Sequence, residues 1–148
     1  MELAVGAALP QWTLESVSGE RMKLLAAILR DPNPIHWDPA EVARRGLGFR
    51  AINQGPTNLG YVTNMLMSFA GPASLRRLNA RFTSNVFDGD RVVAGGVITA
   101  IREQDGEQLI DCDVWLDGGD GTRAVAGTAT VALDAAAQAR LGHRVSAR

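Results

Sequence analysis

The sequence predicts an α+β fold in which a curved antiparallel sheet wraps around one buried helix. Apolar residues recur at helical spacing over residues 56–69, with few polar positions between them. Four strand-like segments then follow one another between residues 77 and 133, separated by turns rich in Gly and Asp. Because strands segregated from one apolar helix form a layered α+β structure, we expect the helix to pack on the sheet.

The composition is that of an ordinary globular chain. Its 148 residues suit a single domain over residues 1–148, and 46% of them are hydrophobic while 21% are charged. The net charge of −1 provides no basic surface, so we expect no nucleic-acid partner. No signal-like N-terminus or membrane-length apolar run is present, so we expect a cytoplasmic protein without membrane contact. The lone Cys112 excludes an internal disulfide and is expected to be buried and inert.

The elements before the buried helix are predicted as one strand and one amphipathic helix. Residues 11–17 alternate loosely between polar and apolar side chains, which indicates a strand. Ser18 is a good N-cap, and apolar residues recur at helical spacing from there to Arg30. The helix has to end at that point, because Pro32 disfavours helical backbone in the residue before it.

The next segment, residues 31–36, is expected to be an ordered, extended loop, because it contains two prolines. Asp38 then caps a short helix that has Pro39 at its first position. Glu41 stands where a capping box requires an acidic residue.

The second half of the chain is predicted as consecutive strands. They cover residues 77–82, 91–101, 108–116 and 123–133. Asp105 and Gly106 form a strong signal for a tight hairpin. The alanine-rich tail from about residue 135 is expected to fray.

The loop after the first helix carries the residues that indicate a chemical function. Asp31, Asn33 and His36 place a carboxylate, an amide and an imidazole on one stiff loop. An imidazole can exchange a proton near neutral pH, and a carboxylate beside it can share a water molecule or orient the ring. Such a pair taken alone is more often structural, and asparagine before proline is a good turn former. The role of Asn33 therefore stays open between structure and catalysis.

This loop resembles the signature of the MaoC-like dehydratases, which include the (R)-specific enoyl-CoA hydratases. The family pattern is Gly-Asp-x-Asn-Pro-hydrophobic-His-x-Asp-Pro, and residues 30–39 match it except at the leading position, which is Arg30. Residues 81–90 resemble the strand and turn of the family that end in Val-x-x-Gly-Asp. The resemblance covers most of the chain in the right order.

The resemblance implies a hot-dog fold and the hydration of a trans-2-enoyl thioester to an (R)-3-hydroxyacyl product, or the reverse dehydration. It implies that Asp31 and His36 activate the water and that Asn33 fixes their geometry. The Gly55 N–H, at the start of the central helix, would bind the thioester oxygen, and Thr63 stands where the family carries a small hydroxyl residue. No cofactor and no metal are implied.

The partners implied by the resemblance are an acyl-CoA or acyl carrier protein thioester and further hot-dog subunits. We expect a homodimer or a dimer of dimers, because pairing two sheets edge to edge removes an exposed strand edge. A heteromer with a related subunit is also compatible with the family.

Departures from the family pattern keep two other functions open. Arg30, Gln54 and Pro56 replace a small residue, a histidine and a bulky apolar residue, respectively. They are compatible with a non-catalytic or partner-dependent subunit of a heteromeric acyl dehydratase. An acyl-CoA thioesterase is a second alternative, although thioesterases of this fold are not expected to carry the Asp-x-Asn-Pro-Ile-His loop. Gly55 is also compatible with a role as a helix cap or turn, and the Thr63 hydroxyl with a bond to its own helix.

Overall fold

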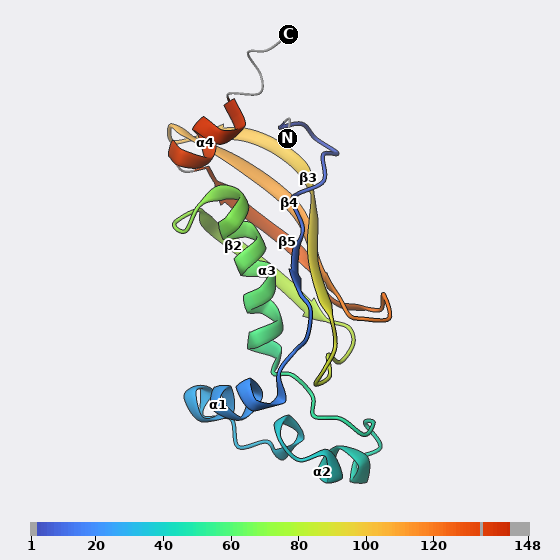
Figure 1. Ribbon diagram of the computed structural model, residues 1–148. Helices are drawn as coiled ribbons and strands as arrows, with labels where there is room; N and C mark the ends of the chain where they lie inside the picture. Colours follow the sequence, from blue (N-terminus) through green and yellow to red (C-terminus); the bar gives the residue numbers. More distant parts are fainter. Residues whose placement is uncertain (1–2, 134, 143–148) are drawn as a thin grey trace.

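The computed structural model describes residues 3–133 and 135–142. The elements are, in chain order, β1 (Trp12–Leu14), α1 (Gly19–Leu29), the 3₁₀ turn η1 (Pro34–His36), α2 (Pro39–Arg44), α3 (Gly55–Ala70), β2 (Leu75–Phe82), β3 (Val92–Gln104), β4 (Glu107–Asp117), β5 (Arg123–Ala132) and α4 (Ala135–Gly142). The strands form one antiparallel sheet in the order β1-β3-β4-β5-β2. The sheet bends around α3, while α1 and α2 lie beyond the end where α3 begins (Figure 1). The predicted α+β arrangement is confirmed.

The central helix α3 is held mainly by burial of its apolar stripe. Val62, Met65 and Leu66 are completely buried and belong to one core cluster with residues of β3, β4 and β5. Burying a side chain of this size stabilises the fold by roughly 1.5–3 kcal/mol. Packing therefore compensates for Gly60 in the middle of the helix, which lowers the intrinsic helix propensity.

Glycine is required in the β3–β4 hairpin and at position 127 of β5. The β3–β4 hairpin turns through Asp105 and Gly106, which have φ angles of 53° and 79°, as the predicted two-residue turn demands. Gly127 pairs with Ala80, and an ideal Cβ placed on Gly127 would clash with the carbonyl oxygen of Asn79. Strands β2 and β5 therefore approach each other too closely for any side chain at position 127.

Two local expectations were wrong. The first strand is only Trp12–Leu14, because the Val17 N–H leaves the sheet and donates to the Asp90 carbonyl. Glu41 does not complete a capping box, because its carboxylate binds the guanidinium groups of Arg44 and Arg45 instead.

The tail from residue 135, which was expected to fray, is helical over its described part. It forms α4, in which Ala137 is buried and Leu141 packs against the core. Alanine favours helix intrinsically, and the small side chain of Ala137 fits against the sheet. Residues 143–148 lie outside the described residues. None of the helices in the described part of the chain is long and apolar enough to cross a membrane.

Candidate active site

The end of α1 fixes the backbone position of Asp31. Arg30 adopts a left-handed conformation with a φ of 53°. The N–H groups of Arg30 and Asp31 donate to the carbonyls of Ala27 and Ala26 at 3.2 and 2.9 Å, the two bonds of a Schellman motif. Glycine is the usual residue at such a position, since it has no Cβ to clash. Arg30 therefore adopts the backbone conformation that glycine usually takes at this position. The replacement of the family's small residue by Arg30 leaves the C-cap of α1 before Asp31 intact.

The loop brings Asp31, Asn33 and His36 together. His36 Nε2 lies 3.1 Å from Asp31 Oδ2. The other carboxylate oxygen of Asp31 accepts the Asn33 N–H at 3.1 Å. The Asn33 side chain accepts the Ile35 N–H at 3.5 Å and caps the turn η1 that carries His36. Asn33 thus supports both members of the pair, through its backbone for Asp31 and through its side chain for η1.

The second ring nitrogen of His36 defines the tautomer. His36 Nδ1 lies 2.6 Å from the carbonyl oxygen of Ile52. Because a carbonyl only accepts hydrogen bonds, Nδ1 must carry a proton, and Nε2 is the nitrogen available for chemistry. The His36 side chain is 8% exposed and that of Asp31 is 32% exposed. The ring is therefore held in the interior, whereas the carboxylate reaches the surface.

An open hollow of about 370 Å³ lies beside Asp31. Its other lining residues are Lys23, Ala26, Ala27 and Trp37, which come from α1 and from the residue after η1. A small molecule can therefore reach the carboxylate from outside the fold.

The start of α3 leaves one amide available for a ligand. Thr57 and Asn58 both donate their N–H groups to the Gln54 carbonyl, and Pro56 has no N–H. Within the described part of the chain, no hydrogen bond uses the Gly55 N–H as donor. Such unpaired amides at a helix N-terminus suit an anionic oxygen.

Gly55 is close in the chain to Ile52, whose carbonyl binds His36, and it lies under an aromatic ring. It follows the Ile52 carbonyl by three residues, which limits the separation to about 10 Å even for extended chain. An ideal Cβ on Gly55 would lie 3.2 Å from the Phe82 ring, which is half exposed at the end of β2. Phe82 therefore forms a wall beside the Gly55 amide, a contact that the sequence did not indicate because the residues are 27 positions apart.

The two remaining residues that the sequence singled out have structural contacts. Gln54 is completely buried, and its Nε2 donates to the Met22 carbonyl at 2.8 Å, which ties α1 to the start of α3. Thr63 lies eight residues along α3 from Gly55, about 12 Å at 1.5 Å per residue. The Thr63 hydroxyl donates to the Leu59 carbonyl at 3.1 Å, so it is already bonded to its own helix.

Sequence reasoning missed a buried amide network behind the site. Asn53 Nδ2 donates to Asn58 Oδ1 at 2.7 Å and to the Tyr61 hydroxyl at 3.4 Å. Burial raises the pKa of Tyr61, whose ring stacks on Trp12 at 5.4 Å. The available signal was Asn58, a polar residue one turn before Val62 on the apolar face of the helix.

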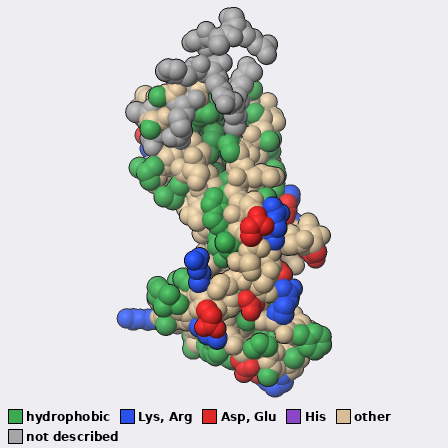
Figure 2. Space-filling model, viewed as in Figure 1, with side chains coloured by type: hydrophobic (Ala, Val, Ile, Leu, Met, Phe, Trp, Pro, Cys, Tyr) green, Lys and Arg blue, Asp and Glu red, His purple; other side chains and the backbone are tan. Residues whose placement is uncertain are grey.

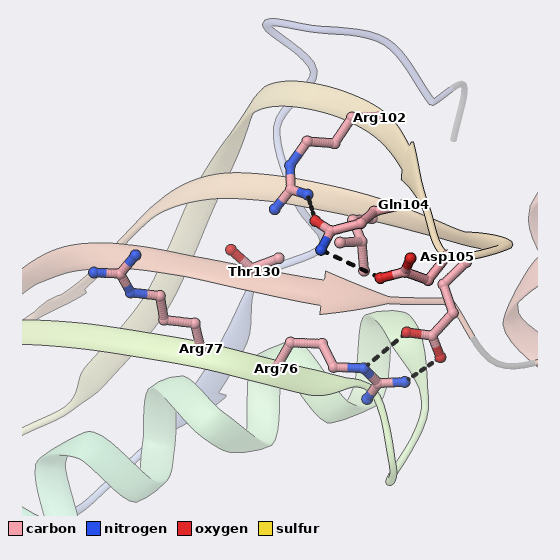
Figure 3. A pocket seen from close by; sticks show the side chains of 8 residues that line it. Arg76, Arg77, Arg102, Gln104, Asp105 and Thr130 are labelled. Carbon is pink, nitrogen blue, oxygen red and sulfur yellow. Dashed lines mark hydrogen bonds and ion pairs between the residues drawn. The ribbon is translucent and has the colours of Figure 1, made fainter.

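Another hollow, of about 300 Å³, lies on the sheet near the β3–β4 hairpin (Figure 3). Arg76 binds Glu107 through two hydrogen bonds of 3.1 and 2.7 Å, and Arg102 binds Asp111 at 2.9 Å. These arginines lower the pKa of Glu107 and of Asp111. Two of the three arginines that line this hollow, Arg76 and Arg102, are therefore neutralised in ion pairs.

The remaining candidate ligands do not form a reactive centre. Cys112 is buried, as predicted, and burial raises its pKa to about 12. Among residues 3–133 and 135–142, no three His, Cys, Asp or Glu side chains are grouped so that they could hold a metal ion.

Comparison with solved structures shows several similar proteins. An (R)-hydratase from A. caviae involved in PHA biosynthesis is 28% identical with a TM-score of 0.78, over 89% of this chain and 98% of that one. R-hydratase PhaJ1 from Pseudomonas aeruginosa is 23% identical with a TM-score of 0.74, over 89% and 83% of the two chains. The ChsH1–ChsH2 complex from Mycobacterium tuberculosis includes a chain that is 23% identical with a TM-score of 0.75, over 88% and 98%.

No curated protein matches the chain in a sequence search. The sequence profile of the MaoC-like domain, in contrast, matches residues 9–115. That range includes the loop 31–36, the helix α3 and most of β4. The chain therefore belongs to the MaoC-like domain family and has its hot-dog fold.

Proposed function

We propose that this protein catalyses the (R)-specific hydration of trans-2-enoyl-CoA thioesters, or the reverse dehydration, with Asp31 and His36 activating the water. The observation that carries the proposal is the 3.1 Å contact between Asp31 Oδ2 and His36 Nε2, with His36 Nδ1 bonded to the Ile52 carbonyl. Membership of the MaoC-like family supports a hydro-lyase reaction at the level of the family.

The pair is suited to hold one water molecule. With its proton on Nδ1, a neutral His36 ring turns a lone pair at Nε2 toward the Asp31 carboxylate. Two neighbouring acceptors do not bond each other, but a water molecule can donate one O–H to each of them. The water oxygen then turns its lone pairs away from the pair and toward a bound substrate. This is the geometry that general base catalysis requires.

The reaction adds the elements of water across the double bond. The water oxygen bonds to carbon 3 while one of its protons passes to the Asp31–His36 pair. The electrons of the double bond move to the thioester oxygen, where the Gly55 N–H stabilises the negative charge. One such donor contributes roughly 3–4 kcal/mol in other oxyanion sites. The pair then delivers a proton to carbon 2, the thioester carbonyl re-forms, and no other reactant is consumed.

Two further residues belong to the proposal. Asn33 holds the loop in shape, since it bonds to Asp31 and caps η1. Thr63 is proposed as a contact for the substrate, since its hydroxyl oxygen can still accept a hydrogen bond while it donates to Leu59.

The test is an assay of the purified chain with crotonyl-CoA and longer enoyl-CoAs, followed by the absorbance of the conjugated thioester. Asp31→Asn and His36→Gln should each lower kcat by about 10²–10⁴-fold, the usual contribution of acid–base catalysis. Asp38→Asn is the matched control, because Asp38 caps α2 through the Ala40 N–H and asparagine caps equally well. Activity that survives in both the Asp31 and His36 variants would refute the proposal.

One alternative is favoured by a specific observation, since a similar structure is the two-protein ChsH1–ChsH2 complex. Activity that appears only after a partner subunit is added would assign the chain to a heteromeric dehydratase. Release of free thiol would instead indicate a thioesterase. A thiol reagent can monitor that release directly, because Cys112 is buried with a pKa of about 12 and reacts little at neutral pH.

We also propose that the chain forms a homodimer or a dimer of dimers. Strand β2 is an edge of the described sheet, and an unpaired edge favours pairing with another chain. The outer side of α1 exposes Leu24, Ile28 and Leu29, and apolar side chains are visible at the surface of this end of the molecule (Figure 2). Light scattering coupled to size exclusion should give a mass of two or four chains, and a monomeric active enzyme would contradict this.

A further inference from the structure

We infer that Asp88 is a positioning residue for the Asp31–His36 pair, an inference that rests on the proposed function. Asp88 Oδ1 accepts the N–H of Gly19, the first residue of α1, at 2.7 Å. A carboxylate at a helix N-terminus is favoured by the unpaired amides and by the helix dipole. Because α1 ends at the turn that carries Asp31, Asp88 fixes the start of the helix whose end presents the carboxylate.

The backbone around Asp88 also supports the segment that holds His36. The Asp88 N–H donates to the Ala51 carbonyl at 2.8 Å, and the Asn53 N–H donates to the Val86 carbonyl at 2.7 Å. Between these two bonds lies Ile52, whose carbonyl accepts from His36 Nδ1 at 2.6 Å. The turn at Asp88 is therefore paired with the strand-like segment that sets the orientation of the His36 ring.

The same segment connects to the catalytic loop on its other side. The Ile52 N–H donates to the Ile35 carbonyl at 2.9 Å, while Ile52 also forms a β-bridge with Phe87. The loop, the segment 51–53 and the turn 86–88 thus lie next to one another as three short backbone strips. A displacement of the turn is transmitted to Ile52 through the hydrogen bonds of its two neighbours, Ala51 and Asn53.

The turn itself is held in one shape by its neighbours. Asp90 Oδ2 accepts the Phe87 N–H at 2.9 Å, and the Gly89 N–H donates to the Val17 carbonyl at 2.8 Å. Arg50 Nη1 donates to the Asp88 carbonyl at 2.6 Å. Asp88 consequently links the two catalytic groups. Its side chain holds the start of α1, which ends at Asp31, and its backbone is bonded beside Ile52, which orients His36. Release of its carboxylate should alter the 3.1 Å contact between the two catalytic groups.

Gly19 offers a second way to move the Asp88 carboxylate. An ideal Cβ on Gly19 would lie 2.8 Å from Asp88 Oδ2. Gly19→Ala should therefore displace the carboxylate without removing its charge, although alanine by itself favours the helix. The two substitutions act on one contact, so their effects should not add.

The kinetic test compares these variants with crotonyl-CoA as substrate. Asp88→Ala and Gly19→Ala should each lower kcat by about ten- to a hundredfold, as expected for misplaced catalytic groups, with KM within about twofold. Asp88→Asn keeps an oxygen acceptor for the Gly19 N–H and should restore most of the activity. Addition of Gly19→Ala to Asp88→Ala should cause no further loss.

A spectroscopic test does not depend on activity. The chain contains two histidines, so the ring ¹⁵N signals of His36 can be assigned by their loss in His36→Gln. The wild-type ring should show a single tautomer with a protonated Nδ1, and Asp88→Ala and Gly19→Ala should each shift these signals. If the wild type hydrates no enoyl-CoA, the proposed function fails, whereas the ring signals still test the role of Asp88.

The matched control is Asp120→Ala, which removes a carboxylate that accepts the Thr122 N–H at 2.8 Å in the β4–β5 turn. It should leave kcat and the His36 signals unchanged. The inference is overturned if Asp88→Ala and Gly19→Ala keep the wild-type kcat and His36 signals, even if they lower Tm. If Asp88→Ala fails to fold, Gly19→Ala provides the same measurements on folded protein, and Asp88→Asn remains the variant that should keep the contact.

Discussion

The region that carries the site and the sheet that supports it are stabilised in different ways. Residues 19–55 are held by caps and by hydrogen bonds to backbone groups, and their buried residues include His36, Asn53 and Gln54. Residues 75–132 are held by apolar packing and by close approach of strands. Polar contacts fix the orientation of side chains and backbone groups but add little net stability. Burial of apolar surface adds stability but does not depend on orientation. Substitutions in the first region should therefore change activity most, and those in the second should change stability most.

The largest effect on stability is expected for Gly127→Ala in the sheet. Its Cβ would clash with the Asn79 carbonyl oxygen, which is backbone and cannot rotate away. The free energy of unfolding should fall by about 3 kcal/mol, near the upper end for overpacked sites. Urea denaturation followed by circular dichroism measures this loss, while kcat per folded molecule should be unchanged.

Gly60→Ala is the control for this comparison. Apart from the neighbouring backbone of its own helix, no heavy atom of the described residues lies within 4 Å of an ideal Cβ on Gly60, which is in the middle of α3. This substitution should raise the free energy of unfolding by up to about 1 kcal/mol through helix propensity. If Gly127→Ala is as stable as the wild type, the close approach of β2 and β5 is incorrect.

In the site region, Gly55→Ala should affect activity more than stability. The substitution keeps the N–H, but its Cβ would meet the Phe82 ring at 3.2 Å and displace the start of α3. We expect kcat/KM to fall about tenfold, which corresponds to about 1.4 kcal/mol of transition-state stabilisation. Phe82→Leu in the same chain should recover part of this loss. A double variant that is as impaired as Gly55→Ala would show that Phe82 is not the obstacle.

Much of this region could be predicted from sequence because its signals are local. Pro32 and the Ser18 cap predicted the two ends of α1, and the loop motif predicted that Asp31 and His36 lie together. The bond of the Gly19 N–H to Asp88 and the Phe82 ring over Gly55 could not be predicted. Asp88 and Phe82 are distant in the sequence from the glycines that they contact.

Length and register were harder to predict for the sheet. β1 is short because the Val17 N–H finds an acceptor outside the sheet, a tertiary contact with no sequence signal. The need for glycine at position 127 depends on the distance between two strands and not on a positive φ angle. Glu41 has a sequence position typical of a capping box, but Arg44 and Arg45 compete for its carboxylate.

A smaller effect on stability, of opposite sign to Gly127→Ala, is expected for Arg30→Gly. Glycine adopts the left-handed conformation of residue 30 without the Cβ clash, so the free energy of unfolding should rise by about 1 kcal/mol. Activity should be unchanged, because the backbone before Asp31 already has this shape. Arg30→Ala is the matched control, since it removes the charge but retains the clash and should not be stabilising. A fall in kcat for Arg30→Gly would show that the arginine side chain itself contributes to the site.

The smallest effect is expected at the surface of α2, where polar contacts are exposed to solvent. The Arg44 and Arg45 guanidinium groups lower the pKa of Glu41 from 4.5 to about 2. Because the folded state favours the charged carboxylate, its contribution is complete above about pH 4.5 and disappears as the pH falls toward 2. A ¹³C carboxyl titration should show this pKa, and Arg44→Gln should raise it more than Arg45→Gln, since Arg44 donates two hydrogen bonds and Arg45 one. High salt should raise it as well, because exposed ion pairs are screened. If Glu41 titrates near its ordinary value, these ion pairs do not persist in solution. The exposed polar contacts of this region would then add nothing to its stability, and its polar support would come from buried contacts such as those of His36.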